Sequence, residues 1–165
     1  MAITKAKKQE IATKLTSIVK DASSLVFVQF NKLSVRDASA MRKSLKTEGV
    51  GFFVAKKTLI RRALSAAGYQ GEIPELPGEV ALAWTTGAGE VTAAARGIYT
   101  HAKKLKGALA LVGGMFENAF RDMAGITAIA TIPPVPVLRG MFVNVINSPI
   151  QGLVIALSKI AEQKQ

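Results

Sequence analysis

The pattern of apolar and polar positions predicts helices and short strands in alternation over the first two thirds of the chain. Apolar side chains recur every three or four positions, which places them on one face of a helix, at residues 3–21, 34–49, 58–68 and 90–105. Short runs rich in β-branched and aromatic residues, typical of strands, lie at residues 24–30, 51–55, 80–84 and 108–112. This alternation predicts an α/β layered domain with one sheet, ending near residues 120–130.

Residues that commonly cap helices mark the ends of the second and third predicted helices. Ser34 is expected to cap the second helix, which ends at Gly49. Thr58 is expected to cap the third helix, which closes at Gly68. Residues 69–77 contain a glycine and two prolines and are expected to form a loop. The apolar face of the second helix is expected to comprise Val35, Ala38, Met41 and Leu45.

Three prolines between residues 132 and 136 separate this domain from the end of the chain. Proline cannot continue a helix and favours extended backbone, so this segment is expected to be a stiff spacer. The sequence therefore predicts a basic α/β domain at residues 1–131, a spacer at 132–136 and a helical tail at 137–165.

The tail contains a repeat. Residues 138–145 and 150–157 share the pattern apolar, polar, Gly, three apolar, small, apolar, and Pro149 between them is expected to kink or break the helix. Apolar positions in both units follow i, i+3, i+4, i+7, the spacing of a helix laid into a groove. On an unbroken helix the 12-residue offset corresponds to about 18 Å and about 120° of rotation, so two successive partners can dock on different sides. The expected docking residues are Leu138, Met141, Phe142, Val145, Ile146, Ile150, Leu153, Val154, Leu157 and Ile160.

Two other interpretations of the tail remain open. An amphipathic helix usually packs on its own domain, but the proline spacer, the duplication and a polar face almost without charge favour a separate partner. Residues 123–158 contain one charged side chain, that of Arg139. A membrane-surface helix would carry several cations on its polar face, where only Arg139 and Lys159 qualify. Polar residues and proline break the apolar stretches before the roughly 18 to 20 residues of a membrane span, so none is expected to cross a bilayer.

The two ends of the chain differ in charge, because nearly all of the net positive charge lies in the first 62 residues. The 165 residues are 49% hydrophobic, yet the formal net charge is +11. Residues 1–62 contain 14 Lys and Arg against four acidic residues, whereas residues 63–165 contain eight against seven. Positive charge gathered in one region indicates a polyanion binder, with a merely solubilising surface as the alternative.

Composition also excludes several classes of protein. The chain has no cysteine, which excludes a disulfide scaffold and thiolate metal sites. Its apolar content argues against disorder over most of the chain. The lysine-rich first 15 residues lack the apolar core of a secretory signal, so a cytoplasmic protein is expected.

One local arrangement has a clear chemical use. Lys56 and Lys57 stand immediately before a predicted helix, where free backbone N–H groups and the positive end of the helix dipole favour a phosphate. A solvated loop is the alternative. Phe52 and Phe53 precede this turn and are expected to be strand core residues, with stacking on a base as the alternative. The full set of candidate RNA contacts is Lys5, Lys8, Lys32, Arg42, Lys43, Lys46, Lys56, Lys57, Thr58, Arg61 and Arg62.

Catalytic signals are weak, and no enzyme activity, metal, cofactor or small-molecule substrate is expected. His101 is the only histidine and is expected at the surface of the fourth helix. Gly87 and Gly89 follow a strand as in a dinucleotide fingerprint, but Thr92 occupies the third glycine position and no acid follows about 20 residues later.

The whole chain resembles the bacterial ribosomal protein L-ten family, the stalk-base proteins of the large ribosomal subunit. Residues 54–63, VAKKTLIRRA, match the family pattern Val-x-Lys-Asn-Thr-Leu-x-x-x-Ala, with Lys57 in place of Asn. Residues 76–83, LPGEVALA, resemble the family's Gly-Pro-Thr-x-Leu-Ala, with Glu79 in place of Pro. Residues 147–154 and 160–164 are similar to the family's ending.

The resemblance implies an α+β plait, with helices on a mixed sheet, followed by an extended C-terminal helical tail. It implies that the basic domain binds large-subunit rRNA next to ribosomal protein L-eleven. It also implies that the tail anchors dimers of the acidic stalk protein, which recruits translational GTPases. Many members of the family also repress translation of their own mRNA, so the resemblance adds this as a further expected role. Compared with the family pattern, this chain lacks an acidic segment and a further helical turn before the repeat. Two stalk dimers are therefore expected, not three. The alternative function is a membrane-surface protein with an apolar anchor.

Overall fold

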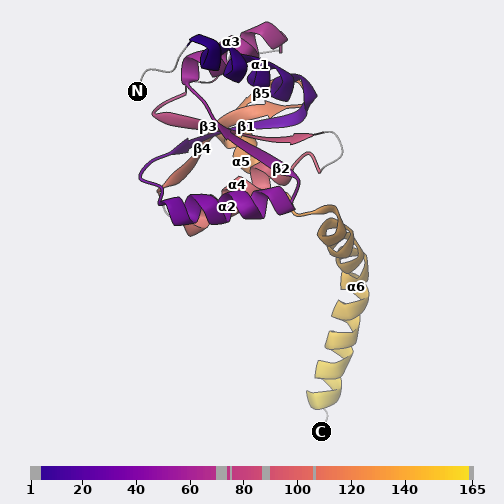
Figure 1. Ribbon diagram of the computed structural model, residues 1–165. Helices are drawn as coiled ribbons and strands as arrows, with labels where there is room; N and C mark the ends of the chain where they lie inside the picture. The colour runs from indigo at the N-terminus through magenta and orange to yellow at the C-terminus, as the bar shows by residue number, and fades with distance from the viewer. Residues whose placement is uncertain (1–4, 70–73, 75, 87–89, 106, 164–165) are drawn as a thin grey trace. The chain divides into compact units, whose positions relative to one another are not determined.

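The computed structural model describes residues 5–69, 74, 76–86, 90–105 and 107–163 (Figure 1). Five strands form one sheet in the order β2-β3-β1-β4-β5, and every described pairing is antiparallel. The expected α/β class with a long C-terminal helix is confirmed, but the mixed sheet implied by the resemblance is wrong. The strands are β1 (Ala22–Phe30), β2 (Val50–Val54), β3 (Glu79–Thr86), β4 (Leu109–Phe116) and β5 (Ala119–Asp122).

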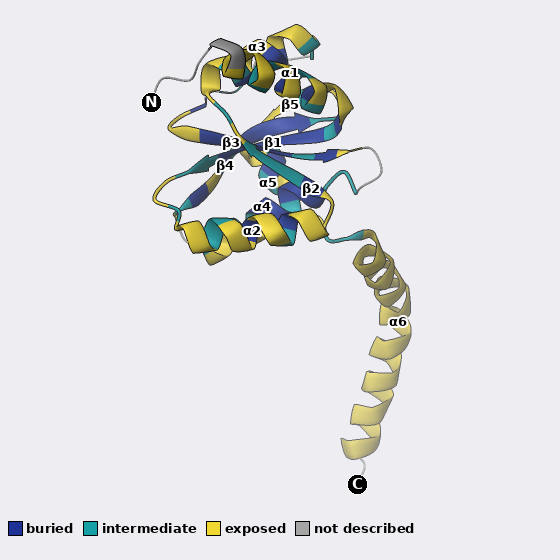
Figure 2. Cartoon of the chain, viewed as in Figure 1, coloured by how far each residue is buried: buried dark blue, intermediate teal, exposed yellow. Residues whose placement is uncertain are grey.

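Helices cover both faces of this sheet, with β1 at its centre. On β1, Leu25 and Phe27 face the core beneath α1 and α3, whereas Val26 and Val28 face the core beneath α2, α4 and α5. This alternation follows from the two-residue period of a strand and makes three layers (Figures 1 and 2). The helices are α1 (Lys5–Asp21), α2 (Val35–Thr47), α3 (Lys57–Ala67), α4 (Ala93–Lys104), α5 (Met123–Ala130) and α6 (Val135–Gln163).

The predicted starts of two helices are wrong. The cap of α3 is Lys56, whose side chain makes no capping hydrogen bond, and Thr58 lies inside the first turn. A hydroxyl cap stabilises a helix by only about 1 kcal/mol, which is less than the stabilisation from burying Ile60 and Leu64. Burial of these two side chains therefore decides where the helix begins and which face points inward. α4 begins at Ala93 instead of residue 90.

Ser34 caps α2 as expected, and its hydroxyl oxygen accepts from the backbone N–H of Asp37 at 3.1 Å. Gly68 ends α3 in the left-handed conformation, also as expected. The prediction that Val35 lies on the inward face of α2 is wrong. Val35 is the first residue of the helix and is 84% exposed, whereas Met41 and Leu45 are buried as predicted.

Strand β4 extends four residues beyond its predicted end at residue 112. The sequence gives no strand signal there, because two glycines interrupt the apolar run. Close packing explains the glycines: a Cβ on Gly114 would collide with the Leu25 carbonyl oxygen and lie 2.9 Å from Cδ1 of Ile126. The absence of a side chain at Gly114 lets α5 approach the centre of the sheet, whereas a Cβ on Gly113 would lie 2.9 Å from the Arg121 carbonyl oxygen of β5.

The hairpin between β4 and β5 offers a test of the local backbone. Glu117 and Asn118 have φ angles of 52° and 63°, the left-handed values of a two-residue type I′ turn. Asparagine tolerates this region and glutamate does not. We expect Glu117→Asn to raise the free energy of unfolding by about 1 kcal/mol in urea titrations. Glu117→Ala, which keeps the unfavourable φ, is the control and should give no gain; equal gains from both would contradict the explanation.

The chain divides into two compact units, Met1–Ile132 and Pro133–Gln165. The expected spacer extends to residue 136, whereas α6 begins at Val135, because proline is tolerated in the first turn of a helix. Of the two outcomes predicted for Pro149, a kink or a break, the break is wrong: α6 is one helix through this residue (Figure 1). The cost of one missing backbone hydrogen bond does not end a helix that continues for fourteen residues beyond it.

Within the described residues, α6 is long and apolar enough to cross a membrane by length and composition. Its richest 18-residue window has a mean hydropathy of 1.5. The expectation that polar residues and proline leave every apolar stretch too short to span a membrane is therefore wrong. These residues interrupt the apolar run, but the mean hydropathy of the helix stays high.

Candidate functional site

The basic turn, by which we mean Lys56 and Lys57, joins β2 to α3 and lies at one end of the sheet, where β1 and β2 end and β3 begins. Phe30 pairs with Glu79, and Val54 pairs with Ala81, so the last residues of two strands and the first of a third are neighbours. The chain leaves β2 at Val54 and enters α3 through Lys56, whose extended backbone (φ −65°, ψ 135°) turns it into the helix. This connection brings the predicted phosphate site to the edge of the sheet.

A cavity of about 550 Å³ opens at this turn. We call it the α3 pocket. Its walls combine apolar side chains from α1, β1, β2, α3 and β3 with the exposed residues of the basic turn. Gly78, with φ of +61°, forms part of the wall, and a Cβ there would lie 2.6 Å from Nε2 of Gln29. The lining residues are Ile11, Phe30, Val54, Ala55, Lys56, Lys57, Thr58, Leu59, Gly78, Glu79 and Val80.

A second cavity of about 460 Å³, which we call the α2 pocket, adjoins the first and shares Phe30, Val54 and Glu79 with it. Lys32 and Arg42 line it. The guanidinium carbon of Arg42 lies 5.6 Å from the centroid of the Phe52 ring, a cation–π contact. Phe52 and Phe53 are half-buried and pack against opposite core clusters, so the expected core role of both is confirmed.

The structure thus brings together five of the predicted RNA contacts along two adjoining pockets: Lys32, Arg42, Lys56, Lys57 and Thr58. The remaining ones line neither pocket. Lys8 is exposed on α1, Lys43 and Lys46 on α2, and Arg61 and Arg62 on α3, whereas the side chain of Lys5 lies outside the described residues.

Sequence reasoning missed the apolar and acidic members of these walls. Phe30, Val54 and Glu79 are far apart in the chain and become neighbours only through strand pairing. Their one sequence signal is position, since each is the first or last residue of a strand.

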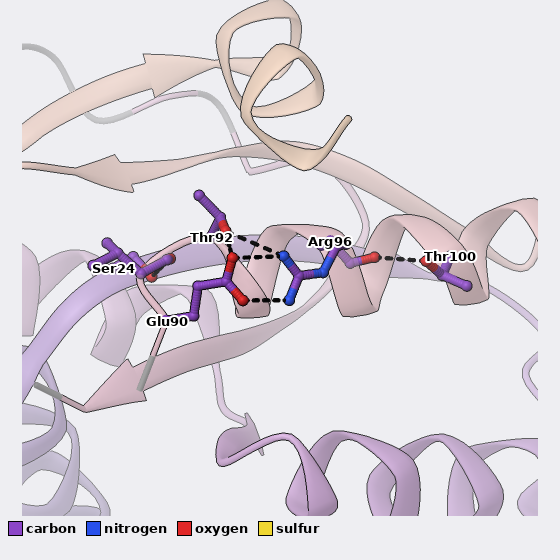
Figure 3. A network of polar contacts seen from close by, with 6 residues as sticks. Ser24, Glu90, Thr92, Arg96 and Thr100 are labelled. Atoms are coloured by element: carbon purple, nitrogen blue, oxygen red, sulfur yellow. Dashed lines mark hydrogen bonds and ion pairs between the residues drawn. The ribbon is translucent and has the colours of Figure 1, made fainter. Parts of the chain in front are cut away.

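A separate polar network fixes the start of α4 (Figure 3). Two guanidinium nitrogens of Arg96 donate to the two carboxylate oxygens of Glu90 at 2.9 and 2.7 Å, and the Thr92 hydroxyl donates to the same carboxylate at 3.1 Å. The hydrogen bond to Glu90 raises the pKa of Arg96. These hydrogen bonds hold residues 90–92 in a turn, so α4 begins at Ala93 and not at residue 90 as predicted from its apolar pattern.

Buried hydroxyls continue this network into the sheet. Ser24 donates to the Val91 carbonyl at 2.7 Å and lies 2.6 Å from the Thr85 hydroxyl. Because a serine hydroxyl has one proton, Thr85 must donate to Ser24. The arrangement ties the turn before α4 to β1 and β3, which is a structural role.

No candidate catalytic or metal centre emerges from the described residues. They contain no group of three or more His, Asp or Glu that could hold a metal ion. His101 is half-buried on α4; burial and the charge of Lys104 lower its pKa, against an opposing effect of Glu48. Gly87 and Gly89 of the weak dinucleotide pattern lie outside the described residues.

The second candidate site is α6 itself. Every large apolar side chain of this helix, including all ten predicted docking residues, is at least 40% exposed. Val143 and Ile155, which lie outside the two predicted stripes, are 63% and 56% exposed. The apolar surface is therefore broader than the repeat pattern indicates. Figure 2 shows that α6 is exposed along its whole length.

Comparison with known proteins adds an independent finding. Residues 3–112 match the family model described as ribosomal protein L10. The chain is 32% identical over 158 residues to the large ribosomal subunit protein uL10 of Shouchella clausii, covering 96% of this chain and 93% of that protein. It is 34% identical over 157 residues to uL10 of Macrococcus caseolyticus, with coverages of 95% and 90%. Identity to uL10 of Bacillus licheniformis is 31% over 158 residues, with coverages of 96% and 93%.

Proposed function

Because the chain belongs to the ribosomal protein L10 family, we propose that it joins large-subunit rRNA to the mobile stalk of the ribosome. The family is structural and non-enzymatic, and this member is a cytoplasmic, ribosome-associated protein of the large subunit that serves translation. In the proposed arrangement, the basic α/β domain binds rRNA at the stalk base, and α6 anchors two dimers of the acidic stalk protein.

The exposed apolar surface of α6 is the observation that carries this proposal. A soluble protein rarely exposes so large a contiguous apolar surface unless a partner covers it. All large apolar side chains of α6 are at least 40% exposed over a continuous 29-residue helix. Since the helix is unbroken at Pro149, the two repeat units are offset by about 18 Å and about 120°, so two partners can bind without sharing a side.

Clustered cations support the rRNA contact. The two pockets beside the basic turn are lined by exposed Lys32, Arg42, Lys56 and Lys57, and further exposed cations lie on α1, α2 and α3. Such a surface displaces counterions from phosphates, so binding should weaken steeply as salt rises. By the family resemblance, ribosomal protein L-eleven is the proposed neighbour, and repression of the protein's own mRNA is a further proposed role.

Native mass spectrometry of the full chain with the acidic stalk protein tests the tail's role. We expect one chain to bind two dimers. An aspartate on one repeat unit should remove one dimer, because burying an unpaired charge in an apolar groove is costly. Phe142→Asp and Val154→Asp are therefore each expected to leave a single dimer, while Asn144→Asp, on the polar face, should leave both. Three dimers on the unaltered chain, or none, would contradict the proposal.

The alternative, a membrane-surface protein with an apolar anchor, is favoured by the length and hydropathy of α6. Flotation of the full chain with phosphatidylglycerol vesicles at physiological salt tests it directly. We expect the protein to stay at the bottom of the gradient when the stalk protein is present, because the same apolar surface is then covered. Flotation of the complete complex would favour the membrane alternative.

A further inference from the structure

The α3 pocket has the chemical character of a site for an apolar group. Ile11, Val54, Leu59 and Val80 supply aliphatic side chains, and Phe30 adds an aromatic ring. These residues come from five different elements whose places are fixed by the two cores. At about 550 Å³, the pocket is within the range of about 300–1,000 Å³ typical of small-molecule sites.

Anion-binding groups lie in the same pocket. Lys56 and Lys57 are exposed and belong to its lining; Lys56 is the N-cap of α3 and Lys57 is its first residue. Leu59 donates its N–H to the Lys56 carbonyl at 2.9 Å, so the N–H groups of Lys57 and Thr58 are the ones at the start of the helix with no preceding turn to bond to, and the Lys56 side chain provides no cap for them. An anion at this point would face both the ammonium groups and the start of the helix.

An apolar pocket beside groups that can bind a phosphate is complementary to a nucleotide whose base is unpaired. We propose that the α3 pocket receives the base of one unpaired rRNA nucleotide, with its phosphate held by Lys56 and Lys57. The inference rests on the proposed rRNA binding and narrows it to an unpaired segment. A paired and stacked base cannot enter a pocket, whereas splayed bases of loops and bulges can.

Glu79 gives the site a means of choosing among bases. It is exposed, it is the first residue of β3, and it is the one carboxylate among the residues that line the two pockets. A carboxylate accepts hydrogen bonds and matches the exocyclic amino group of cytosine, whereas uracil offers a carbonyl oxygen at that position. The pocket should therefore favour an amino-bearing base.

Fluorescence anisotropy with short RNAs tests the proposal on the full chain. The probes are labelled C12, labelled U12, a C12·G12 duplex and, as a competitor, free CMP. We expect C12 to bind about tenfold more tightly than the duplex at equal salt, because one base gains stacking and burial. Tighter binding of the duplex would overturn the proposal, as would competition by CMP at the concentration at which C12 binds, which would indicate a free nucleotide as the ligand.

Filling the pocket without altering charge separates the base contact from the phosphate contact. Ala55→Leu and Thr58→Leu both enlarge lining side chains, and Thr58 is exposed, so its variant should fold even if the first does not. Each should weaken C12 binding about tenfold while leaving the slope of log affinity against log salt unchanged. Ala12→Leu is the matched control, because Ala12 is half-buried on α1 and lines neither pocket.

The outcomes separate this inference from the function on which it rests. If the wild-type chain binds no RNA, the proposed rRNA binding itself fails. If it binds RNA and the filled variants bind as well as Ala12→Leu does, only the base pocket is wrong. Glu79→Gln should reduce the preference for C12 over U12 at least fivefold; an unchanged preference would remove Glu79 from base selection.

Discussion

Deletion of residues 133–165 is expected to abolish binding of the acidic stalk protein and to leave rRNA binding unchanged. The deletion removes all of α6, and with it every predicted docking residue. The remaining unit, Met1–Ile132, contains both core clusters and both pockets, so its fold does not depend on the tail. Isothermal titration calorimetry with the stalk protein and filter binding with large-subunit rRNA would measure the two activities separately.

The expected loss is complete because an interface made by one helix disappears with that helix. Thermal unfolding of the shortened chain is the control for its fold, and a variant that lacks only residues 164–165 keeps all of α6 and controls for shortening itself. Loss of both activities, or of neither, would contradict the division of labour between the two units.

Replacement of Lys56 and Lys57 by alanine is expected to weaken rRNA binding by one to two orders of magnitude at low salt. Each lysine that neutralises a phosphate contributes roughly 0.7 to 0.9 to the slope of log affinity against log salt. The slope should therefore fall by about 1.4 to 1.8 in the double variant, measured by filter binding between 50 and 200 mM salt.

Lys103→Ala/Lys104→Ala is the matched control for this pair. Both of these lysines are exposed at the end of α4 and line neither pocket, so the double variant has the same net charge as the test variant. We expect its salt slope to change little. Equal losses in the two double variants would mean that net charge alone drives binding and would remove Lys56 and Lys57 from the phosphate contacts.

The elements with strong periodicity could be predicted from the sequence. α1, α2 and α3 show one apolar stripe each, and β1 and β2 are runs of residues that prefer strands. β5 has four residues, two of them exposed, and α5 is apolar around most of its surface. Neither β5 nor α5 has an apolar periodicity by which the sequence could reveal it, and both form through packing against β4.

The candidate site was predictable only as far as local sequence could define it. Lys56 and Lys57 stand out because of their charge and their place before a helix. The pocket beside them depends on Phe30 and Glu79, which meet through the register of β1 and β3. Antiparallel register is set by tertiary packing, so no short stretch of sequence reveals this wall.

The order of strands in the sheet has a consequence for synthesis of the protein. β1 is made early, yet its two hydrogen-bonded neighbours are β3 and β4, which end at Thr86 and Phe116. The central strand therefore has one open edge until the nascent chain has grown through β4, and both pairings close long loops, which slows folding. A growing chain with an unpaired, strongly apolar strand is prone to misassembly. Pairing of both edges of β1 must wait for β4 to leave the exit tunnel, and the domain is complete only when β5 and α5, which pack on β4, have followed it.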